Sequence, residues 1–445
     1  MVAPDSKLLL LFAVIAVAGL VVLIARFKLN AFLALVLASL FVGVCSGMDL
    51  VNVAKLFQEG VGATLGFVAV VVGLGTMLGK MLAESGGAEV VARAFVRWFG
   101  ESRIHWTLVF VSFVIGLPVF FAVGLVLLVP ILFALAKETK RPLLLLGIPV
   151  AAGLSASHTL VPPHPGPMIA IATLNADVGK TILYGIMVGV PAAILAGPVF
   201  GLFISKRVIA GDTTVVFRTS IAPKAPGAGI TLFTILLPVL LMISSTAADL
   251  ALPAQHAVRR WADFLGAPLT AMLIAVLFSF WSFGKGCGFN RSQILKFTED
   301  CLAPAASIFL VVGAGGGFSR VLADSGTGKA IADLAQNFHM SPLLLGWLIA
   351  ALIRVAVGSA TVAISMAAGL IAPIAAATPG TNLELLVIAM GAGSFMLSHL
   401  NDGGFWFVKE YYNLTVPQTL KSWTVMETIL SVASLIFVLI LNKVF

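Results

Sequence analysis

The chain has 445 residues, of which 60% are hydrophobic and only 10% are charged, and its formal net charge is +8. Soluble domains carry about a quarter charged residues, so this composition excludes a soluble domain and predicts a polytopic membrane protein. The Lys and Arg residues lie in short loops between apolar segments. That pattern orients a membrane protein and does not indicate a nucleic-acid partner.

The first half begins with apolar segments long enough to cross a bilayer, which takes roughly 17 to 25 residues. They lie at 8–25, 29–47 and 61–83. The first has no convincing small-residue cleavage site, so we expect a retained crossing and not a signal peptide. A polar, amphipathic stretch follows at 84–103.

The next apolar block, residues 105–136, has basic residues on both flanks. Both flanks therefore favour the cytoplasmic side, but two full crossings would need about 40 residues. We predict a re-entrant helical hairpin with its tip at Gly116-Leu117-Pro118, where Gly and Pro can turn the chain.

Residues 155–167 interrupt the following apolar segment with two histidines, four prolines and three hydroxyl side chains. Each proline removes a backbone donor and clashes with the preceding turn, so a helix cannot pass through this stretch intact. Inside a membrane, such a break persists only where protein or a water-filled cavity satisfies the freed backbone groups. We therefore predict a broken helix at a binding site, followed by a crossing at 181–204.

A second series of elements follows a predicted cytoplasmic linker at 205–229. It comprises three crossings, a second hairpin block with Gly358-Ser359-Ala360-Thr361 near its middle, a second broken helix and a final crossing. In chain order, their expected places are 230–245, 266–283, 302–323, 342–377, 383–398 with the break at 399–404, and a last segment that ends near Lys443.

Matching segments indicate an internal repeat. Residues 73–86 match 313–326 without a gap at an offset of 240, and Ser157-His158 matches Ser398-His399 at an offset of 241. Residues 175–181 match 413–419 at an offset of 238. Each half then holds five crossings, including one broken helix, and one re-entrant hairpin. Because five is odd, the sequence predicts an all-α polytopic membrane protein with two inverted-topology repeats.

The basic residues give the orientation. With the N-terminus outside, 17 of the 27 Lys and Arg residues fall in cytoplasmic loops and 8 fall outside. This asymmetry favours that topology over its inverse, and it places both termini in the periplasm.

Residues 155–167, 175–181 and 401–410 resemble the gluconate permease family of the ion transporter superfamily. The resemblance covers essentially the whole chain. It implies proton-coupled uptake of gluconate or a related sugar acid across the bacterial inner membrane. It also implies a scaffold domain, a moving transport domain and a homodimer. The family includes carriers of D-serine and of other hydroxy acids, which remain alternatives.

This resemblance suggests a division of the chain into parts. We expect residues 1–104 and 230–341 to form the scaffold of the first and second repeats. Residues 105–204 and 342–445 are expected to form the transport parts, and residues 205–229 link the two halves.

Inverted repeats with a broken helix and a hairpin in each half place a substrate site near the membrane midplane. Half-helix N-termini offer N–H groups and a positive dipole end to an anion. The candidate substrate residues come from both breaks, both hairpin tips and the first arm of the second hairpin: Ser155, Ser157, His158, His164, Gly116, Pro118, Ser359, Thr361, His399, Asn401 and Arg354.

Asp402 is the predicted proton carrier, because an acid in a membrane break is costly and needs a reason. Alternatively, Asp402 forms an ion pair with Lys409. His158 could bind substrate or transfer a proton near neutral pH. Arg354 could compensate the substrate carboxylate, extend toward the membrane surface or pair with an acid. Sodium could replace the proton, since nothing in the sequence requires proton coupling.

Other features have structural interpretations. Glu84 and Asp324 occupy matching places at membrane ends and fit a helix-end or hinge role. The glycine-rich run 313–317 lacks the ending of a phosphate loop, so we expect close helix packing or an unwound helix face. The three cysteines form no paired framework and are expected to pack as small apolar residues: Cys45, Cys287 and Cys301.

The sequence also disfavours two other classes of membrane protein, an enzyme and a channel. A membrane enzyme with a metal at His158 and His164 would need a third ligand, and none has a familiar spacing. A channel is disfavoured because two occluding hairpins imply a closed site. The prediction is a transporter without a cofactor.

Overall fold

The computed structural model describes residues 5–100, 103–210, 222–253, 255–302, 306–326, 341–400 and 402–444. All regular elements in these ranges are helices. Nine helical segments among the described residues are long and apolar enough to cross a membrane. The predicted all-α class is confirmed, and the chain is a multi-pass membrane protein.

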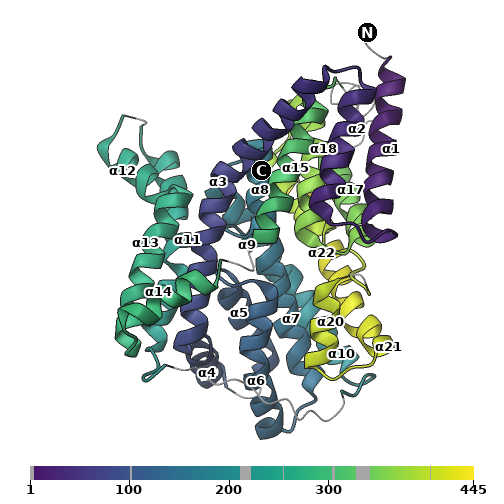
Figure 1. The fold of residues 1–445 in the computed structure, drawn as a ribbon. Helices are drawn as coiled ribbons and strands as arrows, with labels where there is room; N and C mark the ends of the chain where they lie inside the picture. The colour runs from purple at the N-terminus through teal and green to yellow at the C-terminus, as the bar shows by residue number, and fades with distance from the viewer. Residues whose placement is uncertain are drawn as a thin grey trace.

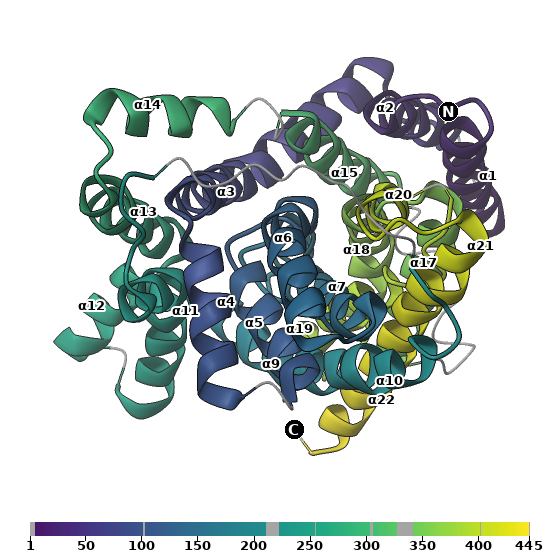
Figure 2. The same cartoon turned by 90° about the horizontal axis from the view of Figure 1, so that it is seen from below.

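Three N-terminal helices form one side of the molecule. α1 (Ser6–Ala25) and α2 (Ala31–Cys45) pack side by side at one edge (Figure 1). α3 (Leu50–Ser85) has 36 residues, which corresponds to about 54 Å at 1.5 Å per residue. This exceeds the roughly 30 Å of a hydrocarbon core, and α3 runs obliquely across the molecule (Figure 2). The predicted crossing at 61–83 is only its later part.

The rest of the first half surrounds the centre of the molecule. In the broken pair α7–α8, 94% of the most apolar window is buried, so this element forms the innermost layer. The helices that follow α3, with a π-helical turn at Leu195–Val199, are α4 (Gly87–Phe99), α5 (Ile104–Gly116), α6 (Phe121–Thr139), α7 (Leu143–Leu160), α8 (Pro165–Leu174), α9 (Val178–Ile194) and α10 (Phe200–Ile204).

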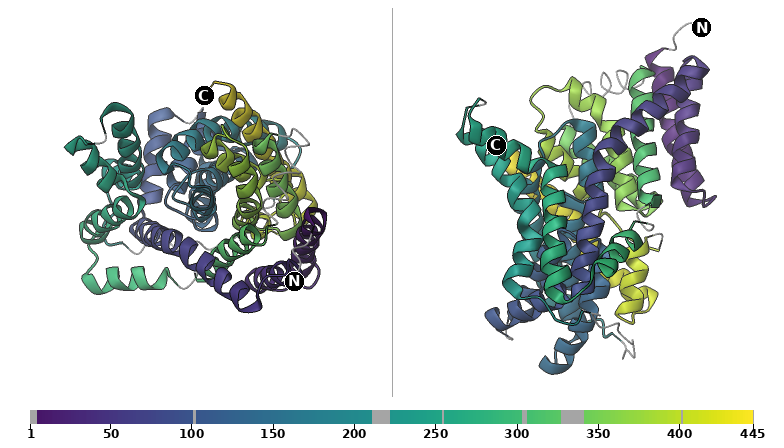
Figure 3. Two further views of the ribbon diagram at one scale, coloured as in Figure 1. Left: turned by 90° about the horizontal axis from the view of Figure 1, so that it is seen from above. Right: turned by 60° about the vertical axis from the view of Figure 1, so that its left-hand side comes forward.

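The second half begins at the edge opposite α1 and α2. Figure 3 shows α11, α12 and α13 on one side and the α1–α2 pair on the other, with α3 between them. The helices are α11 (Ala228–Ala251), α12 (Ala257–Gly266), α13 (Pro268–Ser279), α14 (Arg291–Asp300), α15 (Ala306–Asp324), α17 (Pro342–Val357), α18 (Ala360–Ala377), α19 (Leu383–Gly393), α20 (Gly403–Tyr411), α21 (Val416–Thr419) and α22 (Val425–Val444).

The helices are interrupted at or near each predicted place, but both breaks have other limits. α7 continues through Ser155 and His158 to Leu160, and α19 ends at Gly393, five residues before the predicted Ser398. Leu117–Phe120 separates α5 from α6, and Gly358-Ser359 separates α17 from α18. The two predicted breaks separate α7 from α8 and α19 from α20. That each hairpin enters and leaves on one membrane face stays a prediction. Part of the predicted linker, residues 211–221, lies outside the described residues.

The glycine run 313–317 is a close-packing helix face, as one of the two interpretations predicted. It lies within the continuous helix α15, which crosses α3. A Cβ on Gly60 would lie 2.5 Å from the carbonyl oxygen of Gly316 and 2.8 Å from the Cα of Gly317. Two helix backbones approach this closely only where side chains are missing.

Local geometry recurs at positions matched by the 238-residue offset. Asn175 (φ 54°) and Asn413 (φ 48°) both adopt the left-handed conformation after a helix. Two residues later, the side chains of Asp177 and Thr415 cap the next helix, accepting from the amides of Lys180 and Gln418. This recurrence supports the predicted repeat.

Candidate functional site

A cavity of about 710 Å³ lies where the helix interruptions of both halves meet. Its wall includes both turns between paired helices, both broken helices, part of α3 and the start of α22. Pro118, Ser155 and His158 of the first half line it. So do four predicted residues of the second half: Arg354, Ser359, Thr361 and Asp402.

Four other predicted residues are not among the described residues that line the cavity: Gly116, Ser157, His164 and His399. The hydroxyl of Ser157 donates to the carbonyls of Gly153 and Leu154, both at 3.1 Å. It also lies 2.1 Å from where a Cβ on Gly116 would be, so only glycine fits there. His399 Nε2 donates to the Val355 carbonyl at 3.0 Å. Asn401 lies outside the described residues.

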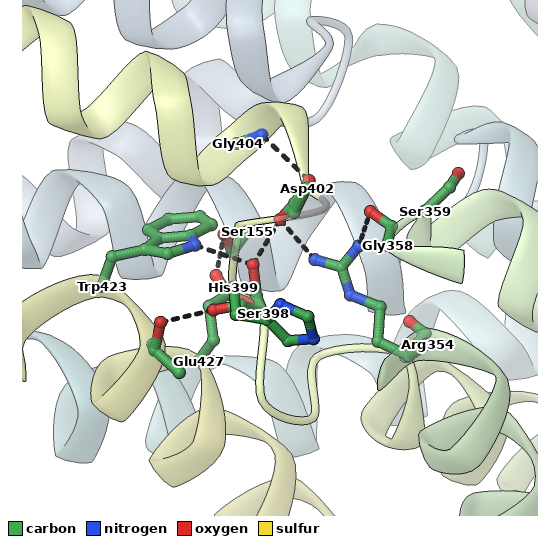
Figure 4. Close-up of polar contacts among 12 residues, drawn as sticks. Ser155, Arg354, Gly358, Ser359, Ser398, His399, Asp402, Gly404, Trp423 and Glu427 are labelled. Atoms are coloured by element: carbon green, nitrogen blue, oxygen red, sulfur yellow. Dashed lines mark hydrogen bonds and ion pairs between the residues drawn. The ribbon is translucent and has the colours of Figure 1, made fainter. Parts of the chain in front are cut away.

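An ion pair between Arg354 and Asp402 lies in the cavity wall (Figure 4). Arg354 Nη2 lies 2.5 Å from Asp402 Oδ2, and the two side chains are 4% and 13% exposed. Arg354 Nη1 donates to the Gly358 carbonyl, so the arginine also holds the turn between α17 and α18. Of the uses weighed for Arg354, the structure displays the pairing with an acid. The alternative partner Lys409 instead contacts Glu410 at 2.6 Å.

Further hydrogen bonds fix Asp402 at the start of α20. Asp402 accepts from the Gly404 amide at 2.9 Å, which makes it the cap of this half-helix. It also accepts from the hydroxyl of Ser398, whose oxygen accepts from Trp423 Nε1 at 2.7 Å. The second break is therefore organised around one carboxylate and its donors.

The two histidines of the first break contact each other. His158 Nδ1 and His164 Nδ1 are 3.1 Å apart, and His164 Nε2 lies 2.6 Å from the Gly116 carbonyl oxygen. His164 thus lies behind His158 and connects it to the turn between α5 and α6. Phe120 packs against both rings, with centroids 5.7 and 6.1 Å away.

Glu427 on α22 also lines the cavity, and sequence reasoning missed it. It is 2% exposed and accepts a hydrogen bond of 2.6 Å from Ser155 Oγ. The available signal was an acid near the start of a long apolar segment, which is rare in membranes and marks a function by default. The 238-residue offset places Gly189 opposite Glu427, so the repeat gave no hint of it.

Comparison with known proteins decides the family. A family model described as GntP family permease matches residues 8–444. The chain belongs to the GntP permease family. Members of this family are permeases, so the prediction of a membrane transporter is confirmed.

Relatives of this GntP permease match over nearly their full length. It is 49% identical to a gluconate permease of Pseudomonas aeruginosa, over 98% of both chains. It is 44% identical to a high-affinity gluconate transporter of Escherichia coli, over 98% of this chain and 99% of that one. A D-serine transporter of Escherichia coli is 38% identical over 95% of both chains.

The fold of the GntP permease also resembles a solved transporter. The YdaH transporter of Alcanivorax borkumensis superimposes with a TM-score of 0.64 over 90% of both chains, at 18% sequence identity. At that identity the likeness concerns the fold alone.

The acids at the two matched membrane ends are held in ion pairs. Lys80 lies 2.5 Å from Glu84 and Arg320 lies 2.8 Å from Asp324, each one helical turn apart. This geometry supports the predicted helix-end role. Among the described residues of this GntP permease, no group of three or more His, Cys, Asp or Glu side chains could hold a metal ion.

Proposed function

We propose that this permease imports gluconate or a related sugar acid together with a proton, by alternating access. The observation that carries the proposal is the Arg354–Asp402 pair in the wall of a cavity large enough for such a solute. Relatives named for gluconate support the substrate.

The ion pair suggests how proton and substrate are coupled. Arg354 can pair with the carboxylate of a sugar acid as well as with Asp402, because both present the same planar oxygens. When the substrate takes Arg354, Asp402 loses its cation. Leaving a buried charge without its partner costs about 3–5 kcal/mol, so a proton on Asp402 restores the balance. His158, the second predicted coupling residue, lines the same cavity.

The position of the cavity favours an elevator-like movement. Thr76, Gly79 and Lys80 of α3 and Cys301 line one side of it, and they belong to the expected scaffold parts. Ala83 and Asp300 of the same parts also line it, and the remaining wall residues belong to the expected transport parts, residues 105–204 and 342–445. A site at the boundary between two parts changes its access when one part moves against the other.

The membrane context completes the proposal. We expect the protein in the bacterial inner membrane with both termini in the periplasm, following the distribution of basic residues. A homodimer is expected from the family resemblance.

D-serine or another small hydroxy acid is the second candidate substrate, with sodium as the other possible coupling ion. The specific observation in favour of D-serine is Glu427, a carboxylate in the cavity wall that could bind an ammonium group. One relative is named as a D-serine transporter.

Uptake of labelled gluconate into proteoliposomes tests the proposal. An inward proton gradient is expected to drive accumulation, a sodium gradient of equal size is not, and D-serine is expected to compete poorly. Uptake that ignored both gradients would rule out symport. Strong inhibition of gluconate uptake by D-serine would favour the second candidate.

A further inference from the structure

We propose that two buried hydrogen-bond relays turn the α7 side of the cavity into a wall of acceptors, which selects acids that donate hydrogen bonds from hydroxyl groups. His164 and Glu427 are the positioning residues of these relays, and His158 and Ser155 are the groups they orient. The inference rests on the proposed function, because it concerns the substrate of the same cavity.

The first relay fixes the tautomer of His158. A carbonyl oxygen only accepts, so the hydrogen in the 2.6 Å contact with Gly116 belongs to His164 Nε2. In a neutral His164, Nδ1 then carries no hydrogen, so it accepts a hydrogen bond from the Nδ1–H of His158 at 3.1 Å. A neutral His158 with its hydrogen on Nδ1 has a bare Nε2. No described residue hydrogen-bonds to that atom, and His158 lines the cavity.

The second relay fixes the hydroxyl of Ser155. With Glu427 ionised, Ser155 Oγ donates its one hydrogen to Glu427 Oε1 at 2.6 Å. A hydroxyl has one hydrogen and two lone pairs, so Ser155 has only acceptor capacity left toward the cavity that it lines. Glu427 itself adds carboxylate oxygens to the same wall.

The cavity therefore has two chemically different sides. Arg354 provides a donor and a positive charge for a carboxylate. Ser155, His158 and Glu427 provide acceptors. A hydroxy acid can pair its carboxylate with Arg354 and donate its hydroxyl groups to the acceptors. A carboxylate without hydroxyl groups leaves the acceptors without a hydrogen-bond partner, which weakens its binding.

The tautomer can be measured without any transport. In ¹⁵N-histidine spectra of the full-length protein in lipid, His158 is identified as the signal pair that disappears in His158→Asn. We expect a bare Nε2 and a protonated Nδ1. His164→Gln can still donate to Gly116 and accept from His158, so it should preserve this pattern, whereas His164→Leu should lose it. His256→Asn, at the N-cap of α12 and outside the cavity, is the control. A protonated Nε2 in the wild type would overturn the relay.

Uptake of single-deoxy gluconates tests the consequence for selectivity. Removing the hydroxyl that bonds to His158 should raise the apparent KM on the order of tenfold in the wild type. The same removal should have no effect in His158→Phe, because the acceptor is gone. If all deoxy analogues enter the wild type as well as gluconate, the acceptor wall is wrong. If gluconate itself does not enter, the proposed function fails, while the spectra still decide the relay.

Discussion

At the scale of single residues, the charges of the cavity come mainly from the second half of the chain. Arg354, Asp402 and Glu427 all line it. The offset of 241 places Phe113 and Val161 opposite Arg354 and Asp402, and the offset of 238 places Gly189 opposite Glu427, so all three matching residues are uncharged. The first half contributes Lys80, His158 and the hydroxyls of Thr76, Ser155 and Thr159. Most charged groups of the cavity therefore lie in the second half of the chain.

Asp402→Asn separates coupling from binding. The amide can still accept from the Gly404 amide and cap α20, but it cannot carry a proton as a carboxylate does. Each pH unit of gradient drives about a tenfold accumulation in one-to-one symport, and the variant should lose this accumulation while it keeps substrate counterflow. Both activities are measured in proteoliposomes. Asp324→Asn, a helix-end acid paired with Arg320, is the matched control. Loss of counterflow as well would make Asp402 a structural or substrate-binding residue.

Substitutions of Glu427 separate its charge from its hydrogen bond. Glu427→Gln keeps an oxygen that accepts from Ser155, whereas Glu427→Leu leaves the Ser155 hydroxyl without its partner. The leucine variant should lose about 1–3 kcal/mol of stability, and the glutamine variant much less. Gluconate affinity should survive in Glu427→Gln. Thermal unfolding and substrate competition provide the two measurements. Equal damage by both variants would mean that the negative charge itself is required.

Sequence patterns predicted single residues only in part. Seven of the predicted residues line the cavity, because breaks and turns inside a membrane tend to line cavities. The partner of Arg354 was not predictable, since Asp402 follows 48 residues later in another element. The relay from Gly116 through His164 to His158 likewise joins atoms 48 positions apart, and only the fold brings them together. The repeat does not point to Glu427, because Gly189 occupies the matching place in the first half.

At the scale of elements, proline and glycine residues determine where helices are interrupted, and close packing determines where α3 and α15 contact each other. Pro118, Pro162 and Gly358 follow the ends of α5, α7 and α17, as the sequence analysis expected, whereas α19 ends at Gly393, five residues before the predicted Ser398. The full length of α3 was not predicted, because its first turns carry polar residues such as Lys55, Gln58 and Glu59. These residues still suit a helix, and Lys55 and Glu59 lie one turn apart. The hydropathy of a sequence identifies the apolar part of a helix, but it does not locate helix ends that carry polar residues.

Two glycines of α3 should respond in opposite ways to alanine. Gly60→Ala places a methyl group against the backbone of α15, which cannot move aside. It should lower the free energy of unfolding by about 1–3 kcal/mol. A Cβ on Gly66 would meet nothing within 4 Å, so Gly66→Ala should be neutral or slightly stabilising because alanine favours helix. Thermal unfolding in detergent compares the two, and equal melting temperatures would contradict the packing argument.

At the scale of the whole molecule, the cavity lies where the expected scaffold and transport parts meet. α3 provides one wall from the first half, and Cys301 follows the end of α14 in the second. Seen from below, α3 passes beside the central bundle that contains α5, α6 and α7 (Figure 2). The sequence suggested the two parts through a family resemblance. It could not indicate that their boundary would be the wall of the cavity, because that depends on how distant segments pack.

The salt bridge between Arg354 and Asp402 has a consequence for the electrical character of transport. An empty site carries one positive and one negative charge, and a site with a sugar acid on Arg354 and a proton on Asp402 carries the same sum. In the proposed mechanism, the loaded and the returning forms therefore carry the same net charge through the membrane field, in which moving one charge across 100 mV is worth about 2.3 kcal/mol. A potassium diffusion potential, imposed at constant pH, should leave the uptake rate unchanged. Faster uptake into vesicles with a negative interior would mean that more than one proton enters with each anion.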